Sequence, residues 1–322
     1  MKPAAFLTHA TAIAAAAMAT VTVAPATASH RDARPATYLL TGDAGGSKFE
    51  GIGADQRRGV FYVSEVTGGE IHRGVSGTAQ TEEWLAGDGE DGRFTARGIT
   101  VDKLGRVYVA GGPNGLGTGR PDLWVYSPDG TLLAALRVPG SDVFLNDVAI
   151  GPDGAAYFTN SNDPQVFRVA AGSAGWQAGL WSDASGTIER GAGFNLGGIV
   201  LTADHSAFVV AQGNAGRLWR FPTDGGAVTE VTTGDADLVN ADGLVRRGSE
   251  LTVVRNFSRK VATLRLTADG RVARELRQVA SDPTRVLTTV KVLRGQFLYV
   301  DSKFDETVAS APYEIVTDPV AR

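Results

Sequence analysis

Two carboxylates and an amide recur at the same position of a repeated sequence pattern. Glu50, Asn146 and Asp242 each begin or precede a short apolar segment, and similar lengths of chain separate the three segments. Carboxylate and amide oxygens are ligands that calcium accepts, together with waters, in a flexible geometry. Two carboxylates that share one desolvated place repel each other, so a positive group should lie between them. The first hypothesis is therefore a divalent cation, most simply Ca²⁺, held by these side chains.

A second interpretation of the same residues needs no metal. Arg97 occupies the matching position of the repeat between those of Glu50 and Asn146, so its guanidinium could pair with Glu50 instead. The matching positions of the two remaining repeats hold Gly197 and Thr288. Clusters of ionisable side chains also occur as structural ion pairs. Spacing alone therefore leaves the cation and the internal ion pair equally open.

The repeat that carries these residues is the strongest signal in the chain. Six segments align, and each holds an apolar run, a turn and a second apolar run: EGIGADQRRGVFYVSE, RGITVDKLGRVYVAGG, NDVAIGPDGAAYFTNS, GGIVLTADHSAFVVAQ, DGLVRRGSELTVVRN and TTVKVLRGQFLYVDS. They start at residues 50, 97, 146, 197, 242 and 288, with spacings of 45 to 51 residues. A period of this length is typical of a β-propeller blade. The uninterrupted apolar runs indicate inner strands that are buried on both faces.

Further segments supply the outer strands of each blade. Third strands are expected at 70–72, 123–126, 166–169, 218–221 and 263–266, and a fourth strand at 132–136. The last repeat lacks a fourth strand, whereas residues 37–40 form a strand that precedes the first repeat. We expect this strand to pair around residues 311–317, because closing the ring removes exposed sheet edges. The predicted fold is all-β: a six-bladed β-propeller with four-stranded blades over residues 37–317, closed by its N-terminal strand.

Composition narrows the class of protein. The 322 residues include no cysteine and only four histidines, and their formal net charge is −4. Disulfides and thiolate chemistry are thus excluded. Zinc, copper and haem sites are not expected, because the cysteine and histidine ligands that they need are absent or scarce. The basic residues are scattered, so nucleic acid is not the expected partner. We expect a monomer that acts on, or binds, a small molecule.

The N-terminal residues have the features of an export signal. Lys2 precedes an alanine-rich apolar stretch over residues 4–23, and Ala26-Thr27-Ala28 fits the small-x-small rule for cleavage before Ser29. The sequence predicts a signal peptide at 1–28, a leader at 29–36 and a C-terminal tail at 318–322. No later stretch is apolar enough to span a bilayer. The mature protein is therefore expected to be secreted or periplasmic, without membrane contact.

The segments that begin blades one, three and five resemble those of a known family. Phe49-Glu50-Gly51-Ile52, Asn146-Asp147-Val148-Ala149 and Ala241-Asp242-Gly243-Leu244 are similar, in this order, to motifs of the senescence-marker-protein (regucalcin)/gluconolactonase family. Diisopropylfluorophosphatase shares the six-bladed arrangement, and the resemblance covers essentially the whole mature chain. It implies a calcium-dependent hydrolase of lactones or related esters. Glu50, Asn146 and Asp242 would hold the cation, and Asp242 would also be the base or nucleophile.

The sequence departs from that family on two blades. Gly197 stands where the family has an Asn ligand, and Asn195 would take its place if the strand bulges. The sixth-blade histidine of diisopropylfluorophosphatase corresponds to Thr288 or Thr289. With Arg97 beside the expected cation, these departures keep an alternative open. It is a non-catalytic propeller that binds a small molecule, a polymer or a protein at its channel mouth.

Overall fold

The structure is a computed structural model, and it describes Met1, residues 34–113 and residues 120–320. Residues Arg34–Arg322 form one compact unit. Apart from Met1, the predicted signal peptide lies outside the described residues, as does most of the predicted leader. Over the described part of the chain, no helix has the length and apolar character needed to cross a membrane.

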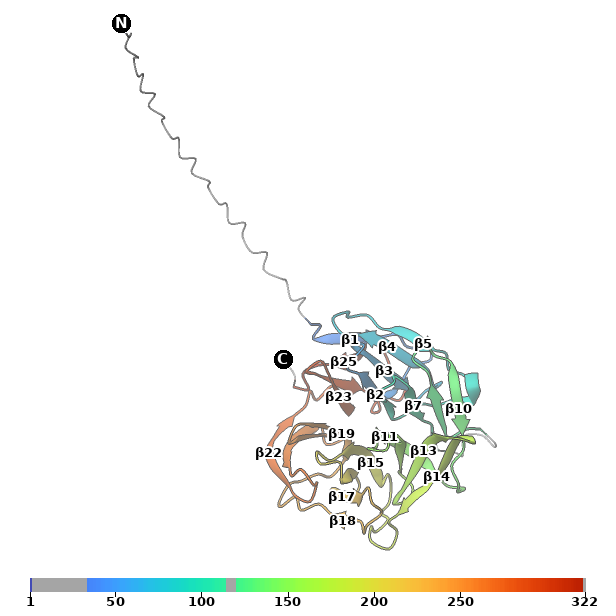
Figure 1. Ribbon diagram of the computed structural model, residues 1–322, viewed down its shortest axis with the longest axis vertical. Helices are drawn as coiled ribbons and strands as arrows, with labels where there is room; N and C mark the ends of the chain where they lie inside the picture. The colour runs from blue at the N-terminus through green and yellow to red at the C-terminus, as the bar shows by residue number, and fades with distance from the viewer. Residues whose placement is uncertain (2–33, 114–119, 321–322) are drawn as a thin grey trace. The chain divides into compact units, whose positions relative to one another are not determined.

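The strands form six antiparallel sheets, one for each blade, which confirms the predicted all-β six-bladed propeller. In Figure 1 the inner strands β2, β11, β15, β19 and β23 lie around the centre, and β5, β10, β14, β18 and β22 lie at the periphery. The first three blades consist of β2 (Phe49–Asp55), β3 (Val60–Glu65), β4 (Ile71–Val75) and β5 (Glu82–Leu85); β6 (Ile99–Val101), β7 (Val107–Ala110), β9 (Leu123–Tyr126) and β10 (Leu132–Leu136); and β11 (Phe144–Ile150), β12 (Ala156–Asn160), β13 (Gln165–Gly172) and β14 (Gly175–Asp183).

The remaining three blades repeat this order of strands. They consist of β15 (Leu196–Leu201), β16 (Ala207–Gln212), β17 (Arg217–Pro222) and β18 (Thr229–Glu230); β19 (Ala241–Arg247), β20 (Glu250–Arg255), β21 (Lys260–Leu266) and β22 (Ala273–Ala280); and β23 (Leu287–Leu293), β24 (Gln296–Asp301), β25 (Tyr313–Val316) and β1 (Thr37–Leu40). A two-residue strand, β8 (Gly112–Pro113), also pairs with the start of β11. The inner strands begin within two residues of the positions that the repeat predicts.

The N-terminal strand closes the ring as expected. β1 pairs antiparallel with β25, from Thr37 opposite Val316 to Leu40 opposite Tyr313. The Tyr38 side chain is fully buried and meets the ring of Phe61 edge-on, with 4.9 Å between the ring centroids. Phe61 belongs to blade one, so the closing strand of blade six also packs against the neighbouring blade.

Hydrophobic clusters fill the spaces between neighbouring blades. Six clusters of buried side chains are present, and each combines residues of two adjacent blades. One of them, for example, joins Val209 of blade four to Leu251 and Leu264 of blade five. Burial of apolar side chains between neighbouring blades therefore stabilises the fold, which suits a chain without disulfides.

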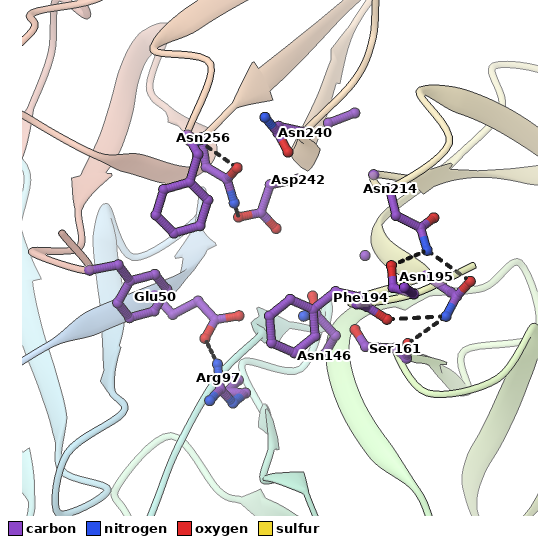
Figure 2. Close-up of a pocket in the computed structure, with 17 residues that line it drawn as sticks. Glu50, Arg97, Asn146, Ser161, Phe194, Asn195, Asn214, Asn240, Asp242 and Asn256 are labelled. Carbon is purple, nitrogen blue, oxygen red and sulfur yellow. Dashed lines mark hydrogen bonds and ion pairs between the residues drawn. The ribbon is translucent and has the colours of Figure 1, made fainter. Parts of the chain in front are cut away.

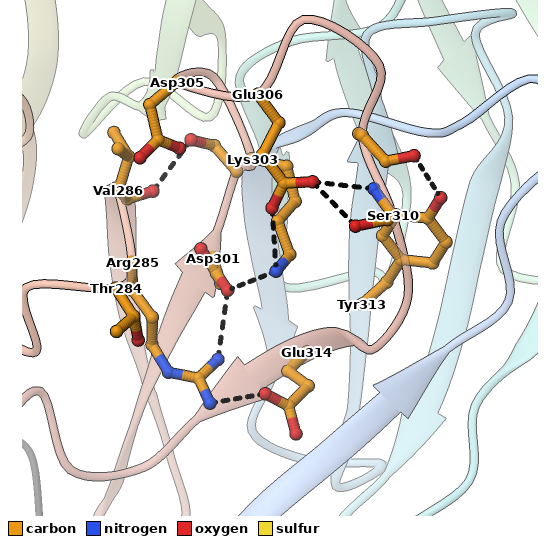
Figure 3. A network of polar contacts seen from close by, with 12 residues as sticks. Thr284, Arg285, Val286, Asp301, Lys303, Asp305, Glu306, Ser310, Tyr313 and Glu314 are labelled. Carbon is orange, nitrogen blue, oxygen red and sulfur yellow. Dashed lines mark hydrogen bonds and ion pairs between the residues drawn. The ribbon is translucent and has the colours of Figure 1, made fainter.

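Ion pairs connect the strands of blade six near the closure (Figure 3). Arg285, in the loop before β23, lies 3.0 Å from Asp301 at the end of β24 and 2.5 Å from Glu314 in β25. Lys303 approaches Asp301 at 3.6 Å and Glu306 at 3.2 Å. Burial raises the pKa of Asp301, and the nearby Lys303 and Arg285 act against that rise. This network holds together the strand ends that receive β1.

Glycines let the inner strands approach one another near the axis. A Cβ atom on Gly51 would collide with the carbonyl oxygen of Arg97, and one on Gly198 would collide with the carbonyl oxygen of Asp242. Only a residue without a side chain fits at such a backbone contact. Gly51 directly follows Glu50 in its strand. A close approach of blades one and two therefore lies beside the predicted site.

Candidate functional site

The inner strands carry a register irregularity at their starts. In five blades the pairing of the inner strand with the second strand shifts within its first residues. A bulge of this kind bends the strand and redirects its side chains. The shifts span the five repeat positions that are occupied by Glu50, Asn146, Gly197, Asp242 and Thr288.

A cavity of about 510 Å³ lies at this end of the inner strands. Its floor includes Glu50, Arg97, Asn146, Gly197 and Asp242, which the sequence predicted to meet at one mouth of the channel. Figure 2 shows the Glu50 and Asp242 side chains extending into this space from two different strands. The structure thus brings together residues that lie up to 192 positions apart in the chain.

The channel narrows directly beneath the cavity. The space there measures about 10 Å³ and is lined by Asp147, Gly243 and Thr289, among others. It is large enough for about one water molecule. Thr288, which the sequence placed at the mouth, is fully buried, and its hydroxyl donates to the Glu50 carbonyl oxygen at 3.0 Å. Thr288 therefore supports the Glu50 backbone, and Thr289 faces the narrow part of the channel.

Both acidic side chains of the floor sit in an environment that disfavours their charge. Desolvation raises the pKa of Glu50, and the nearby Arg97 guanidinium opposes that rise. Desolvation also raises the pKa of Asp242 well above its usual value, and the negative charge of Glu50 adds to the effect. Asn256 acts in the opposite direction, because its Nδ2 donates to Asp242 Oδ2 at 2.9 Å. The two carboxyl groups are thus electrostatically coupled across the floor.

Arg97 forms the internal ion pair that the sequence left open. Its Nη1 donates to Glu50 Oε2, and its guanidinium carbon lies 4.5 Å from the centroid of the Phe144 ring. Figure 2 shows the other carboxylate oxygen of Glu50 directed toward the cavity. One oxygen of Glu50 is therefore occupied by Arg97, and the other remains for a ligand.

The oxygen atoms of the floor fit a hard cation. A Cβ atom on Gly197 would lie 3.7 Å from Asp242 Oδ1 and 3.8 Å from Asn146 Oδ1, which are ordinary contact distances. The two oxygens therefore flank the space that the missing side chain of Gly197 leaves. Together with Glu50 they offer carboxylate and amide donors only, the set that calcium prefers.

Asn195, the expected fourth ligand, lines the cavity, but its side chain bonds to its own loop and to the neighbouring Ser161 and Asn214. Its Oδ1 accepts hydrogen bonds from the Gly191 backbone N–H at 2.8 Å and from Asn214 Nδ2 at 3.1 Å. Its Nδ2 donates to the carbonyl oxygens of Ser161 and Gly193, each at 3.3 Å. In this arrangement Asn195 shapes the cavity wall.

The sequence analysis missed the polar and aromatic walls of the cavity. Ser161 and Asn256 directly follow the second strands of blades three and five. Because the second strand is antiparallel to the first, its end lies at the same mouth as the start of the inner strand. That rule could have found both residues. The other residues missed in the wall are Asn214, Asn240, Phe194, Phe257 and Phe304.

Comparison with known proteins supports the fold. Neither a family model nor a curated protein sequence matches the chain. Among solved structures, a gluconolactonase from Xanthomonas campestris is 17% identical, with a TM-score of 0.58 over 85% of this chain and 87% of its own. A calcium-binding regucalcin from Agrobacterium tumefaciens is 14% identical, with a TM-score of 0.58 over 86% and 97%. Virginiamycin B lyase from Staphylococcus aureus is 14% identical, with a TM-score of 0.59 over 82% and 81%.

These likenesses define a six-bladed β-propeller with the fold of gluconolactonase and regucalcin. The family resemblance seen in the sequence is thus confirmed at the level of the fold. A lyase is among the proteins of similar fold, so the fold by itself does not select one reaction. The chemistry must be argued from the side chains of the cavity.

Proposed function

We propose that this protein is a secreted, calcium-dependent hydrolase of lactones or related esters that acts as a monomer. The observation that best supports this proposal is the convergence of oxygen atoms from Glu50, Asn146 and Asp242 at the floor of one cavity. The fold likeness to a gluconolactonase and to a calcium-binding regucalcin adds to it.

The proposed ligands of the cation are Glu50, Asn146 and Asp242, with waters on the open side beside Gly197. A bound calcium ion would supply a Lewis acid for the substrate carbonyl group. The space beside Gly197 also admits the substrate, because no side chain fills it.

Asp242 serves as the base of the proposed reaction. Its Oδ2 is fixed by the hydrogen bond from Asn256, while its Oδ1 faces the cavity beside Gly197. As a carboxylate, Asp242 can take the proton from a water molecule that lies beside its Oδ1. The environment of Asp242 therefore favours activation of a water molecule next to the substrate.

The walls suit a small molecule with polar and apolar parts. Asn240 offers an amide group, and Phe194 and Phe257 expose large parts of their rings at the cavity. Amides and hydroxyls orient a carbonyl or hydroxyl group, and aromatic faces exclude water from it. A lactone or ester has both kinds of surface.

One observation favours a second candidate, a non-catalytic propeller that binds its ligand at the same mouth. The Arg97 guanidinium already supplies a positive charge to Glu50. In this alternative Arg97 supplies the positive charge in place of a metal ion, and the cavity binds a ligand without hydrolysing it.

Hydrolysis of a panel of lactones by the mature protein tests the two candidates. Dialysis against a chelator should abolish activity, and added Ca²⁺ should restore it. Asp242→Asn should reduce kcat/KM by on the order of a hundredfold or more, because the base is lost. Asp235→Asn, at an exposed aspartate outside the cavity, is the matched control. Ligand binding without hydrolysis, unchanged by chelation, would favour the second candidate.

A further inference from the structure

A second group of carboxylates lies outside the cavity. One oxygen atom from each of Asp43, Glu65 and Glu70 lies within 4.8 Å of the others. Glu65 and Glu70 are buried, with 1% and 6% of their surface exposed, whereas Asp43 is exposed. In the part of the chain that the structure describes, no lysine or arginine forms an ion pair with any of the three. Among the described residues the one printed pair is that of His72 with Glu65, so Asp43 and Glu70 have no cationic side chain bonded to them.

Glu70 is the least satisfied member of this cluster. Its Oε2 atom is buried and has no hydrogen-bond partner among the described residues. A Cβ atom on Gly68 would lie 2.5 Å from this oxygen, and one on Gly87 would collide with Oε1. The carboxylate is therefore enclosed by two glycines that leave room for it. A buried carboxylate oxygen without a donor is costly, so this arrangement points to a positively charged ligand.

Glu65 is held in position by its own neighbours. The Thr67 hydroxyl donates to Oε1 at 2.8 Å, and His72 Nε2 lies 3.2 Å from Oε2. Thr67 is itself oriented by the Lys48 backbone N–H, which donates to its hydroxyl at 3.0 Å. A carboxylate oxygen accepts more than one bond, so Glu65 keeps the capacity to bind a cation. Outer hydrogen bonds of this kind orient the ligands in protein metal sites.

We propose that Asp43, Glu65 and Glu70 bind a calcium ion. Carboxylate oxygens select a hard cation over zinc or copper, which prefer nitrogen and sulfur. The exposed Asp43 leaves one side of the site open to solvent, and calcium readily completes its coordination with waters. None of the three residues lines the cavity described above. This site is thus separate from the proposed hydrolytic site and does not depend on it.

The position of the cluster in the fold gives the ion a structural role. Asp43 lies in the link between β1, which closes blade six, and β2, which begins blade one. Glu65 ends β3, and Glu70 directly precedes β4, so both belong to blade one. The ion would join the connecting segment to blade one at the seam of the ring. It would act as a cross-link there in a chain that has no cysteine.

Calorimetric titration of the chelator-treated mature protein with Ca²⁺ alone tests this proposal, with the melting temperature as a second readout. Glu70→Gln and Asp43→Asn should each weaken binding to this site by at least about tenfold. Both should also remove the part of the calcium-induced rise in melting temperature that this site supplies. The variants should fold, because an amide replaces a carboxylate of the same shape. Asp235→Asn is the control, because Asp235 is an exposed aspartate that belongs to neither site.

Stoichiometry separates this site from the cavity. If both sites bind, the wild type takes two equivalents, Glu70→Gln keeps the cavity equivalent, and Glu50→Gln keeps the other. If the proposed hydrolytic site fails, the wild type takes one equivalent, which Glu70→Gln loses and Glu50→Gln keeps. Calcium binding and thermal shifts unchanged in both Glu70→Gln and Asp43→Asn would overturn the proposal. Equal stabilisation by Mg²⁺ at the same concentration would overturn the assignment to calcium.

Discussion

Arg97 and Glu50 come from neighbouring blades and form an ion pair at the floor of the cavity, with the guanidinium stacked over Phe144. Glu50 and Asp242 belong to blades one and five, and both carboxyl groups have raised pKa values. Arg97 therefore supplies a positive charge directly beside Glu50. Whether Arg97 alone balances the two carboxyl groups, or shares this task with the proposed calcium ion, decides what the cavity does.

Replacing Arg97 by glutamine should make the stability of the protein depend on calcium. Without the guanidinium, Glu50 loses its ion-pair partner, at a cost of about 3 kcal/mol for a largely buried pair. Saturating Ca²⁺ should recover much of this loss by binding to the freed carboxylate. Denaturant unfolding with and without calcium measures the effect, and Arg271→Gln, at an exposed ion pair, is the control. A loss that calcium does not reduce would support the metal-free interpretation of the cavity.

Gly197→Asn should strengthen calcium binding in the cavity. The Cβ position at residue 197 is in ordinary contact with Asp242 Oδ1 and Asn146 Oδ1, so the side chain has room and adds an amide oxygen. We expect a gain of about tenfold in affinity, measured by calorimetry. The neighbouring glycine gives a contrast, because Gly198→Ala would force a Cβ against the Asp242 carbonyl and should destabilise the fold by roughly 1–3 kcal/mol. Weaker calcium binding in Gly197→Asn would contradict the proposed ligand arrangement.

The closing strand should contribute strongly to stability through its inward side chains. Tyr38 is fully buried between blades six and one, so Tyr38→Ala should cost roughly 3–5 kcal/mol by opening a cavity in that interface. Leu39 points the other way along the strand and is exposed, so Leu39→Ala should change stability by less than about 0.5 kcal/mol. Deletion of residues 29–40 should destabilise the protein by several kcal/mol. Thermal melts of the three variants provide the measurement, and a truncated protein that melts with the parent would refute the role of closure.

Glu70 should make the calcium-free protein less stable at neutral pH than at mildly acidic pH. Burial raises the pKa of Glu70 from 4.5 to about 7 in the folded state. Between these values the folded protein holds a proton that the unfolded chain has released, so stability is greatest below pH 4.5 and falls as pH rises to about 7. The contribution is on the order of 3 kcal/mol. Urea unfolding across this range should show the loss in the wild type, and Glu70→Gln should remove this part of the slope.

The architecture follows from patterns that are local in the sequence. The sequence of each blade consists of apolar runs separated by turns. Runs that are apolar without interruption are typical of strands buried on both faces, which are the inner strands of a propeller. The start of β2 at Phe49 and of β19 at Ala241 lies next to the repeat positions 50 and 242 for this reason. Closure by residues 37–40 follows as well, because the last repeat lacks a strand and an open sheet edge is unfavourable. The meeting of Glu50, Asn146 and Asp242 is a consequence of the same repeat.

Side-chain partnerships at the site were decided by the tertiary structure. Whether Arg97 bonds to Glu50, and whether the Asn195 side chain bonds within the cavity wall, depends on rotamers and on neighbours brought in by other segments. The hydrogen bond from Asn256 to Asp242 depends on how two strand ends meet at the bulge of β19. Asp43 meets Glu65 and Glu70 only because the link from β1 crosses the end of blade one. Hydrophobic periodicity specifies which face of a strand is buried. The pairing of polar groups depends on distances between segments in three dimensions, which a periodic pattern in the sequence does not specify.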